Sequence, residues 1–348
     1  MSVFEPGYLA LHRSGELEKR ASALEARLEA CDICPRECGA NRIKGSVGHC
    51  HSGLLPIVSS FCAHHGEEPV LSGTRGSGTI FFGNCNMRCV YCQNFQISQD
   101  PETQRDNKVS TAILAERMLY LQNELHCHNI NFVTPSHFVP QIVKALLEAV
   151  PQGLKIPLVY NTSSYDSVKT LRELDGIIDI YLADIRYASN EIGLKYSRTR
   201  DYAHHARAAI IEMQRQVGDL VIDEAEIAQK GLIVRHLIFP NRIAGSEESL
   251  SWLVKEVSPK VTVSVMAQYY PAHRARKYKE LNRKITPEEY REVVELVEKL
   301  GIENGWVQDL ESAENYRPDF TDEAPFAGRQ GELSEGRRKR KRRRERDA

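Results

Sequence analysis

The sequence predicts an α/β fold in the form of a partial β/α barrel with six units. From about residue 78 onwards, short apolar or β-branched runs alternate with longer segments whose apolar residues recur at helical spacing. Repeated alternation of this kind is typical of a parallel sheet with helices outside it, and six units rather than eight indicate an incomplete barrel. The predicted strands lie within residues 78–83, 129–135, 156–162, 177–184, 232–240 and 261–269.

Helical patterns separate and flank these strands. A closing helix over 286–300 has Thr286 as its expected N-cap, Pro287 at its first position and acidic residues in its first turn. A further pattern over 16–30 predicts a helix in an N-terminal unit, residues 1–30. The other predicted helices lie within 111–126, 138–150, 164–174, 190–216 and 246–257.

The composition is that of an ordinary globular protein, with 41% hydrophobic and 27% charged residues in a chain of 348. No apolar stretch reaches the roughly 18 residues that a membrane span needs. The N-terminus also lacks the basic start and apolar run of a secretory signal. We therefore expect a cytoplasmic protein that has no membrane partner.

Cysteine is concentrated near the N-terminus, because eight of the nine cysteines lie between residues 31 and 92. In a reducing compartment such clustering favours metal ligation over disulfides, so residues 31–70 are predicted to bind metal. The first four thiols suit structural zinc or an auxiliary iron–sulfur cluster, since both accept four thiolates, and ordinary buried thiols are the alternative. They are Cys31, Cys34, Cys38 and Cys50, spaced C-x2-C-x3-C-x11-C.

A second cysteine motif, C-x3-C-x2-C, directly follows the first predicted strand in GNCNMRCVYCQN. The loops after the strands form the active-site end of a β/α barrel. Cys85, Cys89 and Cys92 can hold three corners of a four-iron cluster, whereas an electron-transfer cluster usually has four cysteine ligands. One iron would then keep an open position for a substrate or cofactor. A zinc knuckle is the structural alternative.

This motif, with the aromatic Tyr91 before its last cysteine, resembles the signature of the radical S-adenosylmethionine (SAM) superfamily. The resemblance covers roughly residues 31–310 and is strongest to pyruvate formate-lyase activating enzymes and their uncharacterised relatives with an N-terminal cysteine motif. It implies a TIM-like radical SAM barrel over 71–311 and a [4Fe–4S] cluster that binds SAM. It further implies reductive cleavage of SAM to a 5′-deoxyadenosyl radical that abstracts hydrogen from a substrate, with flavodoxin or ferredoxin as the reductant.

The resemblance also implies roles for individual residues. Thr134 and Pro135, at the end of the second predicted strand, would lie beside the methionine amino group, and backbone near Tyr91 would meet adenine. The stretch NFVTPSH stands where the branch usually has a Gly-Gly-Glu turn, which puts the substrate in question. Polar residues at the ends of later strands are further candidates, because barrel enzymes place functional groups there. They are Asn161, Asp184 with Arg186, Arg235 with His236, and Gln268.

Three other residues are predicted to be structural. Cys62, near His64 and His65, is expected to be a loop thiol outside the metal sites. Cys127 is expected to be a packing thiol at a helix end. His137 is expected to begin the next helix.

The C-terminal tail, residues 312–348, contains a strongly basic stretch. Residues 337–346, RRKRKRRRER, carry nine basic residues and one acidic residue, so the rest of a chain with net charge −1 has about −9. Because it has no apolar side chains to bury, we predict that 337–348 is disordered. The stretch could contact nucleic acid or another acidic partner, or serve as a nuclear address in a eukaryote; a solvated terminus is the simpler interpretation.

Three functions are therefore considered. The first is a radical SAM enzyme that acts on a protein glycine, in the manner of a glycyl-radical activase. The second is a radical SAM enzyme that modifies nucleic acid or a metabolite, with the basic tail attracting phosphate in the former case. The third is a non-enzymatic metal-binding interaction protein, which would leave the six βα units unexplained.

Overall fold

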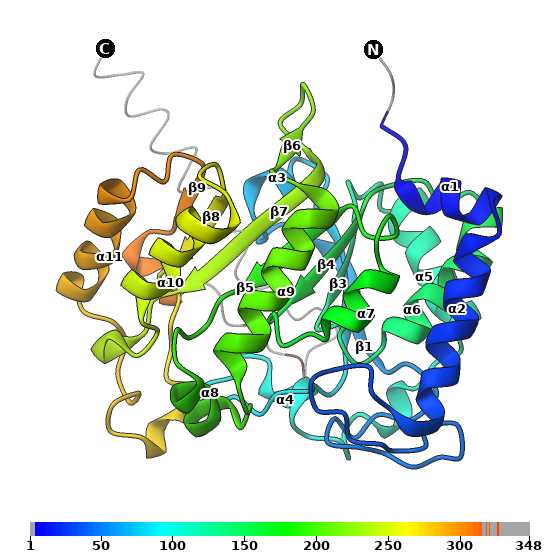
Figure 1. The fold of residues 1–348 in the computed structure, drawn as a ribbon, viewed down its shortest axis with the longest axis horizontal. Helices are drawn as coiled ribbons and strands as arrows, with labels where there is room; N and C mark the ends of the chain where they lie inside the picture. The colour runs from blue at the N-terminus through cyan, green and yellow to red at the C-terminus, as the bar shows by residue number, and fades with distance from the viewer. Residues whose placement is uncertain (1–3, 315–317, 319, 321–325, 327–348) are drawn as a thin grey trace.

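A nine-stranded sheet organises the computed structural model, which describes residues 4–314, 318, 320 and 326 (Figure 1). The strand order is β1-β2-β3-β4-β5-β7-β8-β9, and β6 pairs with β7. The six predicted strands are β2, β3, β4, β5, β7 and β8, and each is parallel to the next, which confirms the α/β class. The strands are β1 (Val58–His64), β2 (Ser77–Phe82), β3 (Ile130–Val133), β4 (Leu158–Thr162), β5 (Ile180–Asp184), β6 (Val221–Ile222), β7 (Ala228–Leu237), β8 (Thr262–Met266) and β9 (Gly305–Val307).

Three of the described strands were not predicted. β1 pairs antiparallel with β2 at one end of the sheet, β9 pairs parallel with β8 at the other, and β6 forms an antiparallel pair with β7. The side chains within β1 are half-buried on both faces, so the strand lacks the apolar alternation that predicts one. Cys62 lies in β1, and its predicted place in a loop is therefore wrong. The curvature implied by a partial barrel stays a prediction.

Side chains alternate between the two faces of the sheet, as strand geometry requires. Phe82, Tyr160 and Val234 belong to the main apolar core, where they pack with apolar side chains of the helices. We call the opposite side the second face; there Leu182 and Ile233 pack in a smaller cluster with Val70 and Leu71 of α3. The helices are α1 (Gly7–Arg13), α2 (Glu16–Ala26), α3 (Pro69–Ser72), α4 (Phe95–Ser98), α5 (Thr111–Asn123), α6 (Val139–Ala149), α7 (Val168–Glu173), α8 (Asn190–Ser197), α9 (Tyr202–Val217), α10 (Ser246–Trp252) and α11 (Pro287–Lys299).

The predicted helices are present, with differences at their ends. Thr286 caps α11 in a capping box with Glu289, and Pro287 is its first residue, as predicted. The single helix predicted over 190–216 is instead α8 and α9, because Arg198 and Asp201 adopt left-handed backbone between them. None of the described helices combines the length and apolar character needed to cross a membrane. The predicted disorder of 337–348 lies outside the described residues.

Candidate functional site

The three-cysteine loop, residues 84–94, follows β2 at the carboxyl ends of the parallel strands. Backbone hydrogen bonds fix it against the end of α8, because the Arg88 and Val90 N–H groups donate to the carbonyls of Ser197 and Tyr196 at 3.0 and 2.8 Å. Each thiol lies within hydrogen-bond reach of a polar group. The three contacts are Met87 N–H to Cys85 Sγ at 3.3 Å, Ser197 Oγ to Cys89 Sγ at 3.1 Å, and Ser98 Oγ with Cys92 Sγ at 3.2 Å.

Burial controls the protonation of two of these thiols. It raises the pKa of Cys85 to about 12, and it also raises the pKa of Cys92 above its usual value. Both groups are therefore neutral thiols at pH 7 in the metal-free chain. Metal ligation requires the thiolate, so a metal must displace these protons when it binds.

Tyr91 sits inside a group of aromatic side chains and is buried. The Tyr187 hydroxyl donates to the Tyr91 hydroxyl at 2.6 Å, and the Phe239 ring contacts the Tyr91 ring edge-on with centroids 4.7 Å apart. The ring thus anchors the three-cysteine loop to the core. The contact between adenine and the backbone near Tyr91 stays a prediction.

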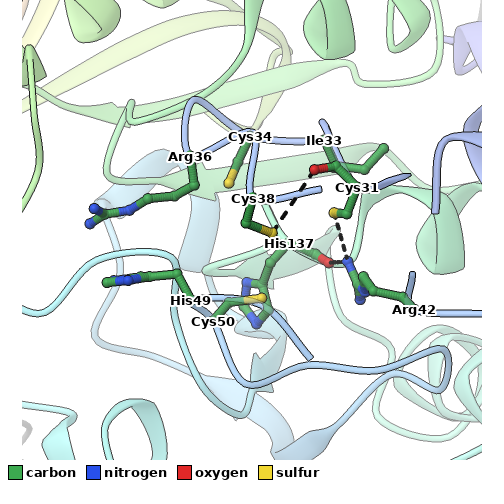
Figure 2. A pocket seen from close by; sticks show the side chains of 9 residues that line it. All are labelled: Cys31, Ile33, Cys34, Arg36, Cys38, Arg42, His49, Cys50 and His137. Carbon is green, nitrogen blue, oxygen red and sulfur yellow. Dashed lines mark hydrogen bonds between the residues drawn. The ribbon is translucent and has the colours of Figure 1, made fainter. Parts of the chain in front are cut away.

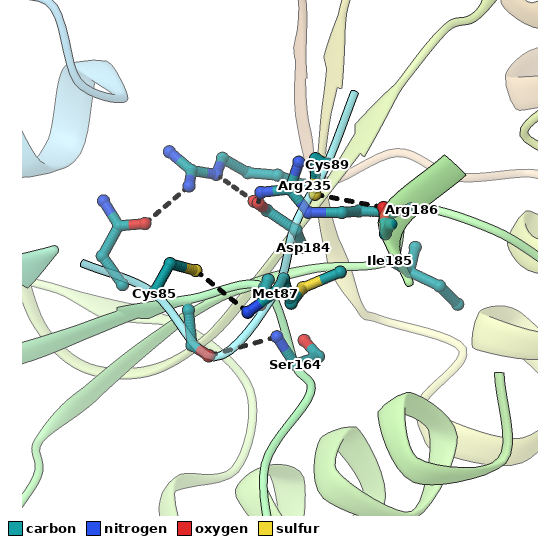
Figure 3. A network of polar contacts seen from close by, with 12 residues as sticks. Cys85, Met87, Cys89, Ser164, Asp184, Ile185, Arg186 and Arg235 are labelled. Carbon is teal, nitrogen blue, oxygen red and sulfur yellow. Dashed lines mark hydrogen bonds and ion pairs between the residues drawn. The ribbon is translucent and has the colours of Figure 1, made fainter. Parts of the chain in front are cut away.

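Three predicted residues form a network on the second face, near the ends of β4, β5 and β7. Figure 3 labels two of them, Asp184 and Arg235. Asp184 and Arg235 share this face with Leu182 and Ile233, because residues two apart on a strand point the same way. Arg235 donates from Nε to Asp184 Oδ1 at 2.7 Å and from Nη2 to Asn161 Oδ1 at 2.6 Å. We call Asn161, Asp184, Arg186, Arg235 and Glu67 the strand-end network.

Glu67 joins this network from the connection between β1 and α3, and it was not among the residues predicted from the sequence. Its carboxylate accepts from Asn161 Nδ2 and Arg235 Nη1, both at 3.4 Å. Burial raises the pKa of Glu67, Arg235 opposes the rise, and the charge of Asp184 adds to it. Burial likewise raises the pKa of the neighbouring Glu68 to about 6. Arg186, predicted alongside Asp184, pairs with that carboxylate.

The turns after three successive strands contain unusual backbone. Asn84, Thr134 and Ser164 follow β2, β3 and β4 within two residues and have φ angles of 64°, 60° and 60°. This left-handed region is unfavourable for a β-branched residue such as Thr134, and strain of this kind is frequent at functional sites. The Thr134 N–H donates to the Asn161 carbonyl at 2.9 Å, which places this predicted residue, followed by Pro135, next to the strand-end network.

The remaining predicted residues lie in other surroundings. His236 points to the helical side of the sheet, where its ring nitrogens contact the Ile185 carbonyl and Ser246 Oγ at 2.9 Å. The Gln268 carbonyl accepts from Gln93 Nε2 at 3.0 Å, beside the three-cysteine loop. Cys127 is buried in the core, as predicted for a packing thiol.

The first four cysteines line one pocket, together with Ile33, Arg36, Arg42, His49 and His137 (Figure 2). We call it the four-cysteine pocket. Three of the cysteines are buried, whereas Cys38 is exposed. Arg42 is almost fully buried; its Nη1 lies 3.9 Å from Cys31 Sγ and donates to the His137 carbonyl at 2.7 Å. His137 lies two residues before the start of α6, so the prediction that it begins this helix is wrong; its Nε2 lies 3.0 Å from the Gly83 carbonyl.

The cysteines do not form a ready site for one ion. Among the described residues, no three His, Cys, Asp or Glu side chains converge as the ligands of a single metal ion would. The thiolates of an iron–sulfur cluster bind separate iron atoms instead. Both cysteine motifs therefore lack a preformed mononuclear centre in this part of the chain.

Comparison with known proteins places the chain in a family. No family model matches the sequence. A solved structure of TYW1 with a lysine-pyruvate adduct bound covers 68% of this chain and 78% of its own, at 10% identity and a TM-score of 0.38, and no function is inferred from so distant a likeness. The uncharacterized protein MJ0674 of Methanocaldococcus jannaschii is 30% identical over 277 residues, which are 78% of this chain and 75% of that protein. The chain therefore belongs to the same family as this archaeal protein.

Proposed function

We propose that the chain is a radical SAM enzyme with a [4Fe–4S] cluster on Cys85, Cys89 and Cys92. The observation that carries the proposal is the position of three hydrogen-bonded thiols at the same sheet edge as a buried polar network. Parallel-sheet enzymes bind their ligands at this edge. The resemblance of the motif supports the reaction class, in which the bound cluster and SAM supply a 5′-deoxyadenosyl radical for hydrogen abstraction.

The chemistry of the loop fits such a cluster. The Met87 N–H and the Ser197 hydroxyl donate to sulfur, and hydrogen bonds of this kind help to set the reduction potential of iron–sulfur clusters. Three cysteines would leave one iron without a protein ligand, and this position would be available to SAM.

The strand-end network supports a role in positioning the cofactor. Asn161, Asp184 and Arg235 are held by one another, so their polar groups are fixed before a ligand arrives. A preorganised site needs little rearrangement on binding. We include Thr134, Pro135 and Tyr91 among the proposed cofactor-binding residues because they flank this network or the three-cysteine loop.

The proposal is tested by measuring 5′-deoxyadenosine after anaerobic reconstitution, reduction with dithionite and addition of SAM. The native chain should form the product, whereas Cys89→Ala should not. Cys62→Ala is the matched control, because this thiol lies in β1 outside the loop, and it should behave like the native chain. A fully loaded native protein that forms no product would contradict the proposal and favour a non-enzymatic metal-binding protein.

Two substrate classes are proposed for this chemistry. A protein glycine is favoured by the resemblance to activating enzymes. Nucleic acid is favoured by the basic stretch 337–346, whose attraction to phosphate would weaken with salt. Deletion of residues 337–348 separates the two, because loss of RNA affinity at low salt would support the second class and unchanged affinity would remove its basis.

We further propose that the four-cysteine pocket binds metal, either zinc or an auxiliary iron–sulfur cluster. Its four thiols share one pocket, and four thiolates suit either centre. Flavodoxin or ferredoxin is the proposed reductant of the enzyme.

A further inference from the structure

A group of aromatic side chains lies on the second face at the β1–β2 end of the sheet. Ile80 and Phe82 belong to the main core, so Phe81 between them points to the second face. Its ring contacts those of Phe320 and Phe326 near the C-terminus, with centroids 5.2 and 5.4 Å apart. These distances are typical of packed aromatic side chains. We call Phe320 and Phe326 the aromatic pair.

The aromatic pair packs on residues outside both apolar clusters. Phe81 is only 4% exposed, although it belongs neither to the main core nor to the smaller cluster. His64 of β1 is also buried, and its ring centroid lies 4.3 Å from that of Phe326. Among the described residues, the rings that contact Phe81 are those of His64 and the pair. The aromatic pair therefore covers this part of the second face.

The covered part borders the strand-end network. Phe81 pairs with Val133 in the register of β2 and β3, and Val133 pairs with Asn161 in that of β3 and β4. The three residues thus form one row across the second face. Because neighbouring strands are about 4.8 Å apart, the backbones of Phe81 and Asn161 are about 10 Å apart. The aromatic pair therefore lies beside the polar groups that we propose position the cofactor.

The aromatic pair also contacts the segment that follows the three-cysteine loop. The Phe320 N–H donates to Gln96 Oε1 at 3.1 Å. Gln96 belongs to α4, and Ser98 at the end of this helix contacts the Cys92 thiol. Phe320 thus bridges α4 and the second face at Phe81. A ligand bound between the three-cysteine loop and the strand-end network would have the aromatic pair as its neighbour.

The chain reaches this position from the other end of the sheet. A short 3-10 helix, Leu310–Glu314, follows β9, which is the last strand in the order, whereas the aromatic pair contacts β1 and β2. Neither Phe320 nor Phe326 belongs to a helix or strand. The hydrogen bond from Phe320 also ends on a side chain rather than on a strand. The pair can therefore leave without breaking the hydrogen bonds between strands.

We propose that Phe320 and Phe326 form a movable cover of the candidate site. The cover is closed in this structure, and a protein or nucleic-acid substrate reaches the strand-end network only after the pair moves aside. Closing a site excludes water from the reaction, and opening limits the turnover of many enzymes. What the cover admits rests on the proposed function, whereas the cover itself rests on the contacts of the pair.

A thiol on the same face reports on the cover. Cys62 of β1 pairs with Thr79 of β2, and Thr79 lies two residues before Phe81. Directly paired residues of neighbouring strands share a face, so Cys62 lies on the second face, where it is half-buried. Cys127 is buried in the main core and serves as the reference thiol.

The cover is tested with Phe320→Ala/Phe326→Ala in the metal-free, full-length chain. Alkylation of the reporter thiol by iodoacetamide, followed by peptide mass spectrometry, should be several-fold faster than in the native chain, because its face is opened. The reference thiol should stay protected. The control Tyr120→Ala/Tyr290→Ala removes two partly exposed rings from α5 and α11 and should leave the rate unchanged. An unchanged rate in the first variant would overturn the proposal.

A milder variant guards against a folding defect. Gln96→Ala removes only the acceptor of the Phe320 N–H and keeps both rings, so it should accelerate alkylation of the reporter thiol less than the double variant does. Acceleration in neither variant relative to the native chain would refute a cover held by these contacts.

The double variant also separates the cover from the proposed chemistry. In the reconstituted, reduced protein with SAM, Phe320→Ala/Phe326→Ala should form 5′-deoxyadenosine several-fold faster than the native chain, because SAM and its products would exchange across an open face. Equal rates of formation in the two proteins would overturn the gating role. If neither protein forms the product while alkylation of the reporter thiol is faster in the variant, the cover stands and the proposed function fails.

Discussion

The strand-end network and the four-cysteine pocket differ in what holds them together. In the network, the side chains of Asn161, Asp184 and Arg235 extend from neighbouring strands and contact one another directly. In the pocket, the thiols come from residues 31–53, a described stretch without helix or strand. Contacts within the fold position the network, whereas we expect the pocket to depend on its proposed metal. Ligand removal should therefore affect the two regions very differently.

The largest expected effect follows removal of metal by a chelator. Metal binding and local folding are coupled, and apparent binding energies of structural zinc reach about 10–16 kcal/mol in zinc-finger peptides. Residues 31–53 should become sensitive to protease, while the strands of the sheet stay protected. Limited proteolysis with mass spectrometry locates the cuts. Retained resistance of 31–53 after complete metal loss would show that the pocket, too, is built by the fold alone.

A large loss of stability is also expected when Arg235 is removed from the strand-end network. Arg235→Met leaves the carboxylates of Asp184 and Glu67 buried without this partner, and breaking a buried ion pair costs about 3–5 kcal/mol. Urea unfolding measures the loss. Arg242→Met is the control, because its pair with Glu292 is exposed and should contribute less than about 1 kcal/mol. Equal losses in the two variants would mean that the network is not preformed.

The buried carboxyl group of Asp179 should make the stability of the sheet region depend on pH. Burial raises its pKa from 3.8 to about 7, although the Leu158 and Gly7 N–H groups donate to its carboxylate. The folded state then binds this proton more tightly than the unfolded state. Its contribution to stability is present below about pH 4 and is lost as pH rises through about 7, by at most about 4 kcal/mol.

The Asp179→Asn variant should flatten this dependence. Urea unfolding between pH 4 and pH 8 should show a smaller fall in the free energy of unfolding for the variant than for the native chain. Parallel curves for the two proteins would show that Asp179 is ionised in the fold throughout this range.

The smallest effect concerns the strained turn after β3. Thr134→Gly removes the β-carbon from a left-handed residue, so it should raise the free energy of unfolding by up to about 1 kcal/mol. Thr262→Gly in β8 should have the opposite effect, because that residue is buried in a strand. Thermal unfolding compares the two. A destabilised Thr134→Gly protein would indicate that the threonine side chain contributes more than its strain costs.

The sequence predicted the network better than the turns around it. Asp184 and Arg235 follow short continuous apolar runs, which are typical of buried parallel strands, so their place near strand ends could be predicted. Glu67 was missed because the connection from β1 to α3 has no periodic pattern. The helix α7 begins at Val168 rather than at residue 164, where Ser164 has left-handed backbone. Such a backbone conformation produces no pattern of apolar residues from which it could be predicted. Contacts between the two cysteine motifs, such as the hydrogen bond from Arg36 Nε to the Asn86 carbonyl at 3.0 Å, depend on tertiary structure and could not be predicted.

The pairing of β1 with β2 has a consequence for how the protein matures. α2 packs against α6 before the cysteine segment, and β1 fixes the chain after it, so residues 31–57 form a loop tethered at both ends. The entropic cost of closing a loop grows only slowly with its length. We therefore expect the sheet to form without the pocket, and the pocket to take up its proposed metal afterwards. If that metal were lost, it would be restored in place, without refolding of the rest of the molecule.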